Sequence, residues 1–172
     1  MDGETWRESL EEYLAQPAPV ETEALRDLVR GLADWPKPAW VAAALGALDA
    51  HRLLRPITYP DVERHRAAAE DWLACPCPRH AQLAREALVK PQGLWGNCND
   101  LLHVSRIAAY SAALAASPEG TPGHAVRAAV TMAHPLVFDP PEVWAAIQAR
   151  LRLLIGAPPA SDAGPTLDRP RG

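Results

Sequence analysis

Prolines divide this sequence into segments of helical periodicity, and this division most limits the folds open to the chain. Eighteen of the 172 residues are proline, and many of them fall where a run of apolar residues spaced three and four apart begins or ends. Proline has a fixed φ and no amide hydrogen, so it suits the first turn of a helix and interrupts helix and strand interiors. The pattern predicts short helices joined by short loops, with no alternating strand.

Seven or eight helices are expected from this pattern. They cover approximately residues 5–15, 22–33, 38–48, 60–74, 78–90, 99–116, 121–133 and 139–156. We therefore predict an all-α fold, either an irregular bundle of seven to eight helices or a short stack of helical hairpins. Residues 99–116 are apolar around most of the helix circumference, which predicts a central position. No repeat of fixed period is present, so a regular solenoid is disfavoured.

Length and composition indicate one main domain. The 33 alanines permit close approach of helices, and the six tryptophans can fill the larger gaps between them. A chain of 172 residues can bury a sizeable core without disulfides or metals. We expect an acidic amphipathic helix with a proline-containing connector at 1–20, a single helical domain at 21–156 and a disordered tail at 157–172.

The charge distribution argues against several classes of partner. The net charge is −4, and residues 1–30 hold eight acidic residues against three arginines. No cluster of lysine and arginine is available to neutralise phosphates, so we expect no binding to nucleic acid. No apolar run is long enough to span a membrane, and no secretory signal is visible. An odd number of cysteines, three, is typical of a reducing compartment, which predicts a cytoplasmic protein.

Five residues form a candidate metal site. Thiolates and imidazoles are preferred zinc ligands, and the chain holds Cys75, Cys77 and His80 close together, followed by Cys98 and His103. The C-x-C spacing differs from the C-x2-C spacing of most zinc modules. The alternative interpretation is that these cysteines are small apolar residues in a segment that ends one helix and begins another.

An enzyme is not required by the sequence. The Walker A, dinucleotide-binding, zinc-protease and serine-hydrolase motifs are all absent. A thiol nucleophile at Cys98, with His103 or His80 as base, would need these side chains to converge in one pocket. We assign no catalytic residue, and we expect a protein without enzymatic activity.

Two segments are candidates for binding a protein partner. Trp6, Leu10 and Leu14 share one face of the first helix, and this face can dock in the groove of a partner or close over its own bundle. We favour the second arrangement. Trp95, Asn97 and Asp100 lie in a polar, glycine-containing loop, and binding residues are often found in such loops.

The order of features from residue 40 to 155 resembles a family of small, alanine- and tryptophan-rich, all-α bacterial proteins of unknown function. The resemblance rests on the segments 38–45, 68–73, 79–87, 124–133 and 151–155. A tryptophan-containing loop that leads into an alanine-rich helix, between the third and fourth of these segments, is also part of the pattern. It implies an accessory or immunity-like role, and Cys75 and Cys77 depart from the family pattern. Our first hypothesis is a non-enzymatic interaction module without a cofactor, which acts as adaptor, accessory subunit or immunity-like partner of a larger bacterial protein. The alternative is a small metal- or ligand-binding protein that uses the five candidate ligands, with zinc as the metal.

Overall fold

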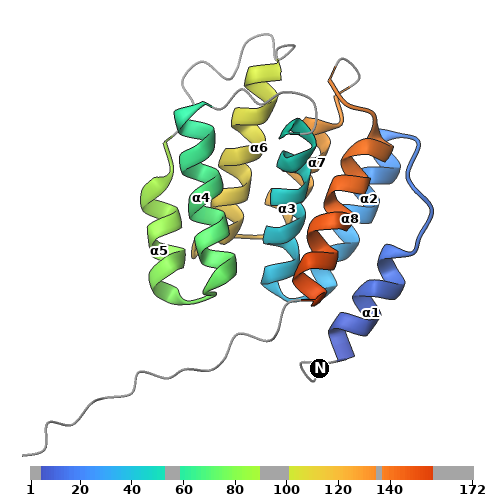
Figure 1. Cartoon of the computed structure of the whole chain (residues 1–172), viewed down its shortest axis with the longest axis horizontal. Coiled ribbons are helices and arrows are strands. Elements are labelled where there is room, and N and C mark those ends of the chain that lie inside the picture. The colour runs from blue at the N-terminus through green and yellow to red at the C-terminus, as the bar shows by residue number, and fades with distance from the viewer. Residues whose placement is uncertain (1–4, 53–58, 90–100, 135–136, 157–172) are drawn as a thin grey trace, which may run out of the picture.

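All regular structure in the described part of the chain is helical, which confirms the predicted all-α class. The structure is a computed structural model and describes residues 5–52, 59–89, 101–134 and 137–156. The elements are α1 (Thr5–Leu14), α2 (Thr22–Gly31), the 3-10 turn η1 (Leu32–Asp34), α3 (Lys37–Arg52), α4 (Pro60–Ala74), α5 (Pro78–Ala87), α6 (Leu101–Ala116), α7 (Pro122–Met132) and α8 (Pro140–Gly156). They form an irregular bundle (Figure 1). The tail expected at 157–172 lies outside the described residues.

Proline begins helices at the expected places. Pro60, Pro78 and Pro122 occupy the first turn of α4, α5 and α7. At the start of α8 the carboxylate of Glu142 accepts a hydrogen bond from the Asp139 backbone N–H at 3.0 Å, which is the glutamate half of a capping box. These local signals account for the close agreement between expected and observed helix starts.

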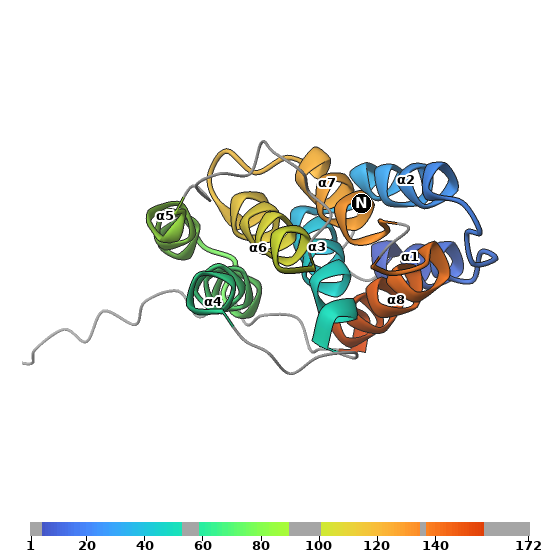
Figure 2. The same cartoon turned by 90° about the horizontal axis from the view of Figure 1, so that it is seen from above.

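The most enclosed helix is α3, which Figure 2 shows in the middle of the bundle with α4, α6, α7 and α8 around it. Residues 41–48 are all buried, so α3 has no solvent-facing side over these two turns. The sequence predicts the central position for the helix at 99–116; α6 is largely buried beside α3, but α3 occupies the centre. Alanine and glycine make α3 narrow enough for this position: a Cβ on Gly46 would lie 2.6 Å from the Ile147 Cα of α8.

The apolar face of α1 closes over its own bundle. Leu10 and Leu14 are fully buried, and Trp6 is half-buried against the core. Tyr13 Oη donates to the Leu28 carbonyl at 2.7 Å, and Gln148 Nε2 of α8 donates to the Leu14 carbonyl at 2.7 Å. Figure 1 shows α1 beside the lower part of α8. The arrangement is the one favoured from the sequence, and it leaves Leu10 and Leu14 unavailable at the surface.

The pair α4 and α5 forms the opposite edge of the bundle, with α5 outermost (Figures 1 and 2). α4 packs on α6, and α5 packs on both. The last turn of α4 is held by Lys37, whose ammonium lies 4.9 Å from the centre of the Trp72 ring and donates to the Ser117 carbonyl at 2.6 Å. Lys37 therefore joins the ends of α3, α4 and α6, and the turn between α4 and α5 follows directly.

No helix in the described part of the chain combines the length and the apolar composition needed to cross a bilayer.

Candidate functional site

The turn between α4 and α5 brings three of the predicted ligands together. The backbone N–H of Cys75 still bonds to the Asp71 carbonyl at 3.1 Å, and Pro76 then stops the helix. The N–H of Cys77 bonds back to the Cys75 carbonyl at 2.8 Å, which closes a three-residue turn centred on Pro76. Cys77 directly precedes α5, and Pro78 occupies its first turn. Two helix ends and two prolines therefore fix the backbone of this segment.

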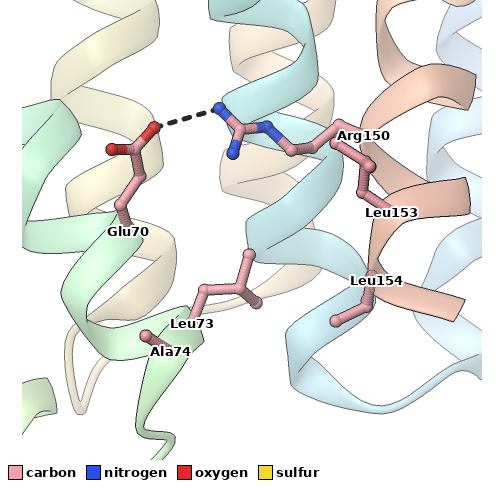
Figure 3. A pocket seen from close by; sticks show the side chains of 6 residues that line it. All are labelled: Glu70, Leu73, Ala74, Arg150, Leu153 and Leu154. Carbon is pink, nitrogen blue, oxygen red and sulfur yellow. Dashed lines mark hydrogen bonds and ion pairs between the residues drawn. The ribbon is translucent and has the colours of Figure 1, made fainter. Parts of the chain in front are cut away.

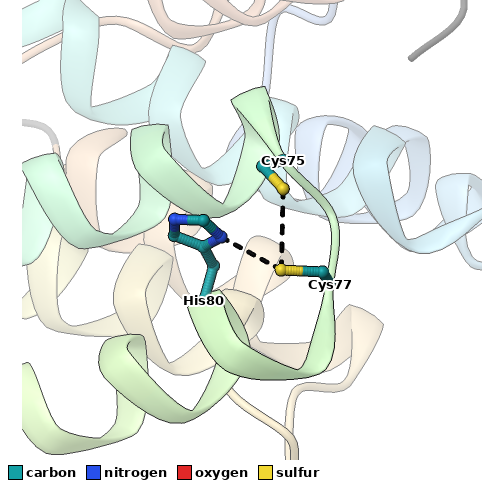
Figure 4. Close-up of side chains that lie close together, drawn as sticks. All are labelled: Cys75, Cys77 and His80. Carbon is teal, nitrogen blue, oxygen red and sulfur yellow. Dashed lines mark hydrogen bonds between the residues drawn. The ribbon is translucent and has the colours of Figure 1, made fainter. Parts of the chain in front are cut away.

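The side chains of this turn point toward one another (Figure 4). Cys75 Sγ lies 3.6 Å from Cys77 Sγ, and Cys77 Sγ lies 3.0 Å from His80 Nδ1. All three donor atoms lie within 4.8 Å of one another. Cys75 is exposed, whereas Cys77 and His80 are half-buried. We call these three residues the CCH cluster.

The two thiols have different acidities. The pKa of Cys77 is lowered from its ordinary value to about 7, first by the backbone N–H of His80 and then by its imidazole. The pKa of Cys75 is raised, mainly because its thiol hydrogen bonds to the Cys77 sulfur and would lose that bond on ionising. Of the two sulfurs, Cys77 is therefore the one that ionises more readily.

The donor set and its spacing fit a tetrahedral metal ion. Zn–S bonds of about 2.3 Å and Zn–N bonds of about 2.0 Å place two sulfurs about 3.8 Å apart, and sulfur and nitrogen about 3.5 Å apart. The S–S distance of 3.6 Å matches closely, and the S–N distance of 3.0 Å needs a small widening. Three ligands leave one of four positions for water or an external donor, as in zinc sites with an open position.

The predicted ligand His103 does not join this cluster. His103 lies in the first turn of α6, where Arg106 pairs with Asp61 at 2.8 Å beside the start of α4. The CCH cluster follows the end of α4, which places it on the order of 20 Å away at 1.5 Å per helical residue. Cys98 lies outside the described residues, so neither its proposed zinc role nor its proposed catalytic pairing can be placed.

A pocket of about 370 Å³ lies beside the last turn of α4, on the side that faces α8. It is lined by Glu70, Leu73, Ala74, Arg150, Leu153 and Leu154 (Figure 3). Arg150 Nη2 donates to Glu70 Oε1 at 3.0 Å, and Arg150 Nε donates to Asp49 Oδ2 at 2.8 Å. Arg66, almost fully buried, also pairs with Asp49. These charges compensate one another within the fold, so the pocket offers mainly leucine side chains to a ligand.

The sequence did not reveal this pocket because its walls come from segments about 80 residues apart, and only packing brings Glu70 and Arg150 together.

The residues predicted to bind a protein partner lie elsewhere in the chain. Leu10 and Leu14 lie in the core. Trp95, Asn97 and Asp100 lie outside the described residues, so partner binding by that loop stays a prediction.

Comparisons with protein-family models, with curated proteins and with solved structures give no match to this chain. The resemblance stated from the sequence therefore stays a prediction.

Proposed function

We propose that this protein binds a zinc ion through Cys75 Sγ, Cys77 Sγ and His80 Nδ1. The observation that supports the proposal is the convergence of three soft donors within 4.8 Å, in a turn whose backbone is held by two helix ends. Convergence in a single short turn needs no long-range rearrangement, so the cost of organising the ligands is small.

The chemistry of the donors favours zinc over hard cations. Thiolate and imidazole ligands select zinc and Cu(I), whereas calcium and magnesium require oxygen ligands. Zinc takes four ligands in a tetrahedral arrangement, and the half-exposed cluster leaves one position accessible from solvent. Cu(I) is the competing soft ion, and the metal titration described below distinguishes the two.

The site differs from a zinc finger in its relation to folding. The helices that flank the turn are held by contacts independent of the ligands: α4 packs on α6, and Lys37 holds its last turn against α3. Zinc fingers unfold without metal because they lack such a core. We therefore propose that the protein is already folded when it binds the metal, so the metal is not needed for folding. Removal of the metal by a chelator is then expected to leave the helical content unchanged.

The test is a metal titration of the full-length, untagged protein, reduced with a phosphine that does not bind metals. Co²⁺ serves as the spectroscopic probe, and one equivalent is expected to give thiolate charge-transfer absorption with the intense visible bands of tetrahedral cobalt. Zn²⁺ is then expected to displace it stoichiometrically. A parallel titration with Cu(I) under anaerobic conditions shows whether copper displaces zinc at equal concentration, which would overturn the assignment to zinc.

Single-residue variants test whether zinc binds at the CCH cluster. Cys77→Ser and His80→Gln are each expected to lower zinc affinity at least about tenfold, because each removes a direct ligand. Cys98→Ser is the matched control, since it removes a cysteine outside the CCH cluster, and its affinity is expected to equal that of the wild type. Uptake below about a tenth of an equivalent, or an equal loss in Cys98→Ser, would contradict the proposal.

A further inference from the structure

The two sulfurs of the CCH cluster are close enough for a second kind of chemistry. Cys75 Sγ and Cys77 Sγ lie 3.6 Å apart, and Cys75 is exposed to solvent. In a fully extended chain, the Cα atoms of two residues that are two positions apart are separated by about 7 Å, which is the upper limit for a disulfide. The turn centred on Pro76, closed by the 2.8 Å bond from Cys77 N–H to the Cys75 carbonyl, shortens this separation. The backbone is therefore already bent as an internal disulfide requires.

Access and proton transfer are also provided for. Cys75 is exposed and Cys77, the sulfur beside the imidazole, is partly exposed, so a small molecule can reach the pair. His80 Nδ1 lies 3.0 Å from the Cys77 sulfur, within hydrogen-bond reach of its proton. Cysteine pairs in folded cores that serve only packing lack both features. The cluster thus combines a nucleophile, a base and a second thiol in a solvent-accessible turn.

We propose that Cys75 and Cys77 are a thiol–disulfide exchange pair that reacts with small disulfides of the glutathione class. The Cys77 sulfur attacks one sulfur of the small disulfide, which forms a mixed disulfide and releases one small thiolate that takes up the displaced proton. The Cys75 sulfur then attacks the Cys77 sulfur of the mixed disulfide, forms the Cys75–Cys77 bond and releases the second small thiol. The two protein thiols lose two electrons and two protons, and one small disulfide becomes two thiols.

The exchange is expected to be reversible. Solvent-exposed disulfides have more oxidising potentials than buried structural ones, so excess small thiol should return the pair to the dithiol form. This inference depends on the positions of the two sulfurs and not on zinc. Where both proposals hold, the oxidised pair has lost two of the three zinc ligands, so metal binding and oxidation exclude each other.

The experiment equilibrates the full-length protein with mixtures of glutathione and glutathione disulfide, with metal removed by a chelator. Samples are quenched in acid, alkylated and digested with trypsin. Residues 67–79 form one tryptic peptide that contains Cys75 and Cys77 and excludes Cys98. We expect this peptide to lose two hydrogens in excess disulfide and to regain them in excess glutathione. Persistent mixed disulfides in the wild type, or a link from Cys98 to either residue, would overturn the proposal.

Variants test the order of events. Cys75→Ser is expected to accumulate the glutathione adduct on Cys77 at least about tenfold above the wild-type level, because the intramolecular attack that removes it is lost. Cys98→Ser is expected to form the internal disulfide as the wild type does. His80→Gln is expected to slow its formation several-fold and to leave the equilibrium position nearly unchanged; an unchanged rate would remove His80 from the mechanism.

A final arm separates the two proposals. One equivalent of Zn²⁺ added to reduced protein is expected to slow formation of the internal disulfide in proportion to site occupancy. Zinc that binds without slowing it would place the metal elsewhere and contradict the proposed function, while leaving the exchange pair intact. Conversely, tight zinc binding by the cluster in a protein that forms only mixed disulfides would overturn the exchange pair alone.

Discussion

The centre of the bundle at α3 and the turn between α4 and α5 differ in how far their side chains are exposed to solvent. In α3, residues 41–48 are enclosed on every side, and Gly46 is needed because the α8 backbone occupies the space of a side chain. In the turn, Cys75 is exposed and Cys77 and His80 are half-buried, so their atoms face solvent and one another. The most enclosed residues thus lie in α3, and the two thiols and the imidazole lie at the edge of the bundle, so we expect changes in the cluster to leave the core intact.

The largest effect on stability is expected from a variant that tests whether α1 packs on the core of the bundle in solution. Leu14→Ala is expected to lower the free energy of unfolding by about 2–5 kcal/mol, because the fully buried side chain leaves a cavity. Val20→Ala, at a site 81% exposed, is the matched apolar control and is expected to change it by less than about 0.5 kcal/mol. Urea denaturation measures both. Equal stabilities of the two variants would mean that α1 is detached in solution.

An intermediate effect is expected in the core itself. Gly46→Ala places a methyl group 2.6 Å from the Ile147 Cα and 3.0 Å from the Ala146 carbonyl oxygen, so α3 and α8 must move apart. We expect a loss of about 1–3 kcal/mol, typical of overpacking. Gly156→Ala, where nothing lies within 4 Å of the new methyl, is expected to be neutral within about 0.5 kcal/mol. A neutral Gly46→Ala would show that the α3–α8 contact is looser than the structure describes.

The smallest effect is expected in the turn. The triple variant Cys75→Ser, Cys77→Ser and His80→Gln removes all three proposed ligands, and its thermal midpoint is expected to stay within about 2 °C of the metal-free wild type. The reason is that the contacts holding α4 and α5, including Lys37 over Trp72, do not involve these side chains. Circular dichroism during heating provides the measurement. A large decrease in the thermal midpoint would mean that the cluster stabilises the fold, as the buried residues of α3 do.

Local signals made most helix boundaries predictable. Pro60, Pro78 and Pro122 begin helices because the first turn requires no amide hydrogen from them. Two C-terminal ends differ from the prediction, since α5 ends at Ala87 and not near residue 90, and α3 continues to Arg52 and does not end near residue 48. The convergence of Cys75, Cys77 and His80 was likewise foreseeable, because the three residues occupy a single turn. His103 could not be placed by such reasoning, since its distance from that turn depends on how α6 lies beside α4.

By itself, the sequence determined which segments are helical and where they stop, and it placed three metal-ligand residue types within one turn, since these properties depend on neighbours a few residues away. Only the tertiary structure decided that α3 is the enclosed helix, that α1 covers its own bundle, and that Arg150 meets Glu70 and Asp49 beside a pocket. The physical reason is that burial depends on which helix faces pack together. Alanine-rich faces fit many other helices almost equally well, and close contacts such as that of Gly46 with Ile147 select one arrangement.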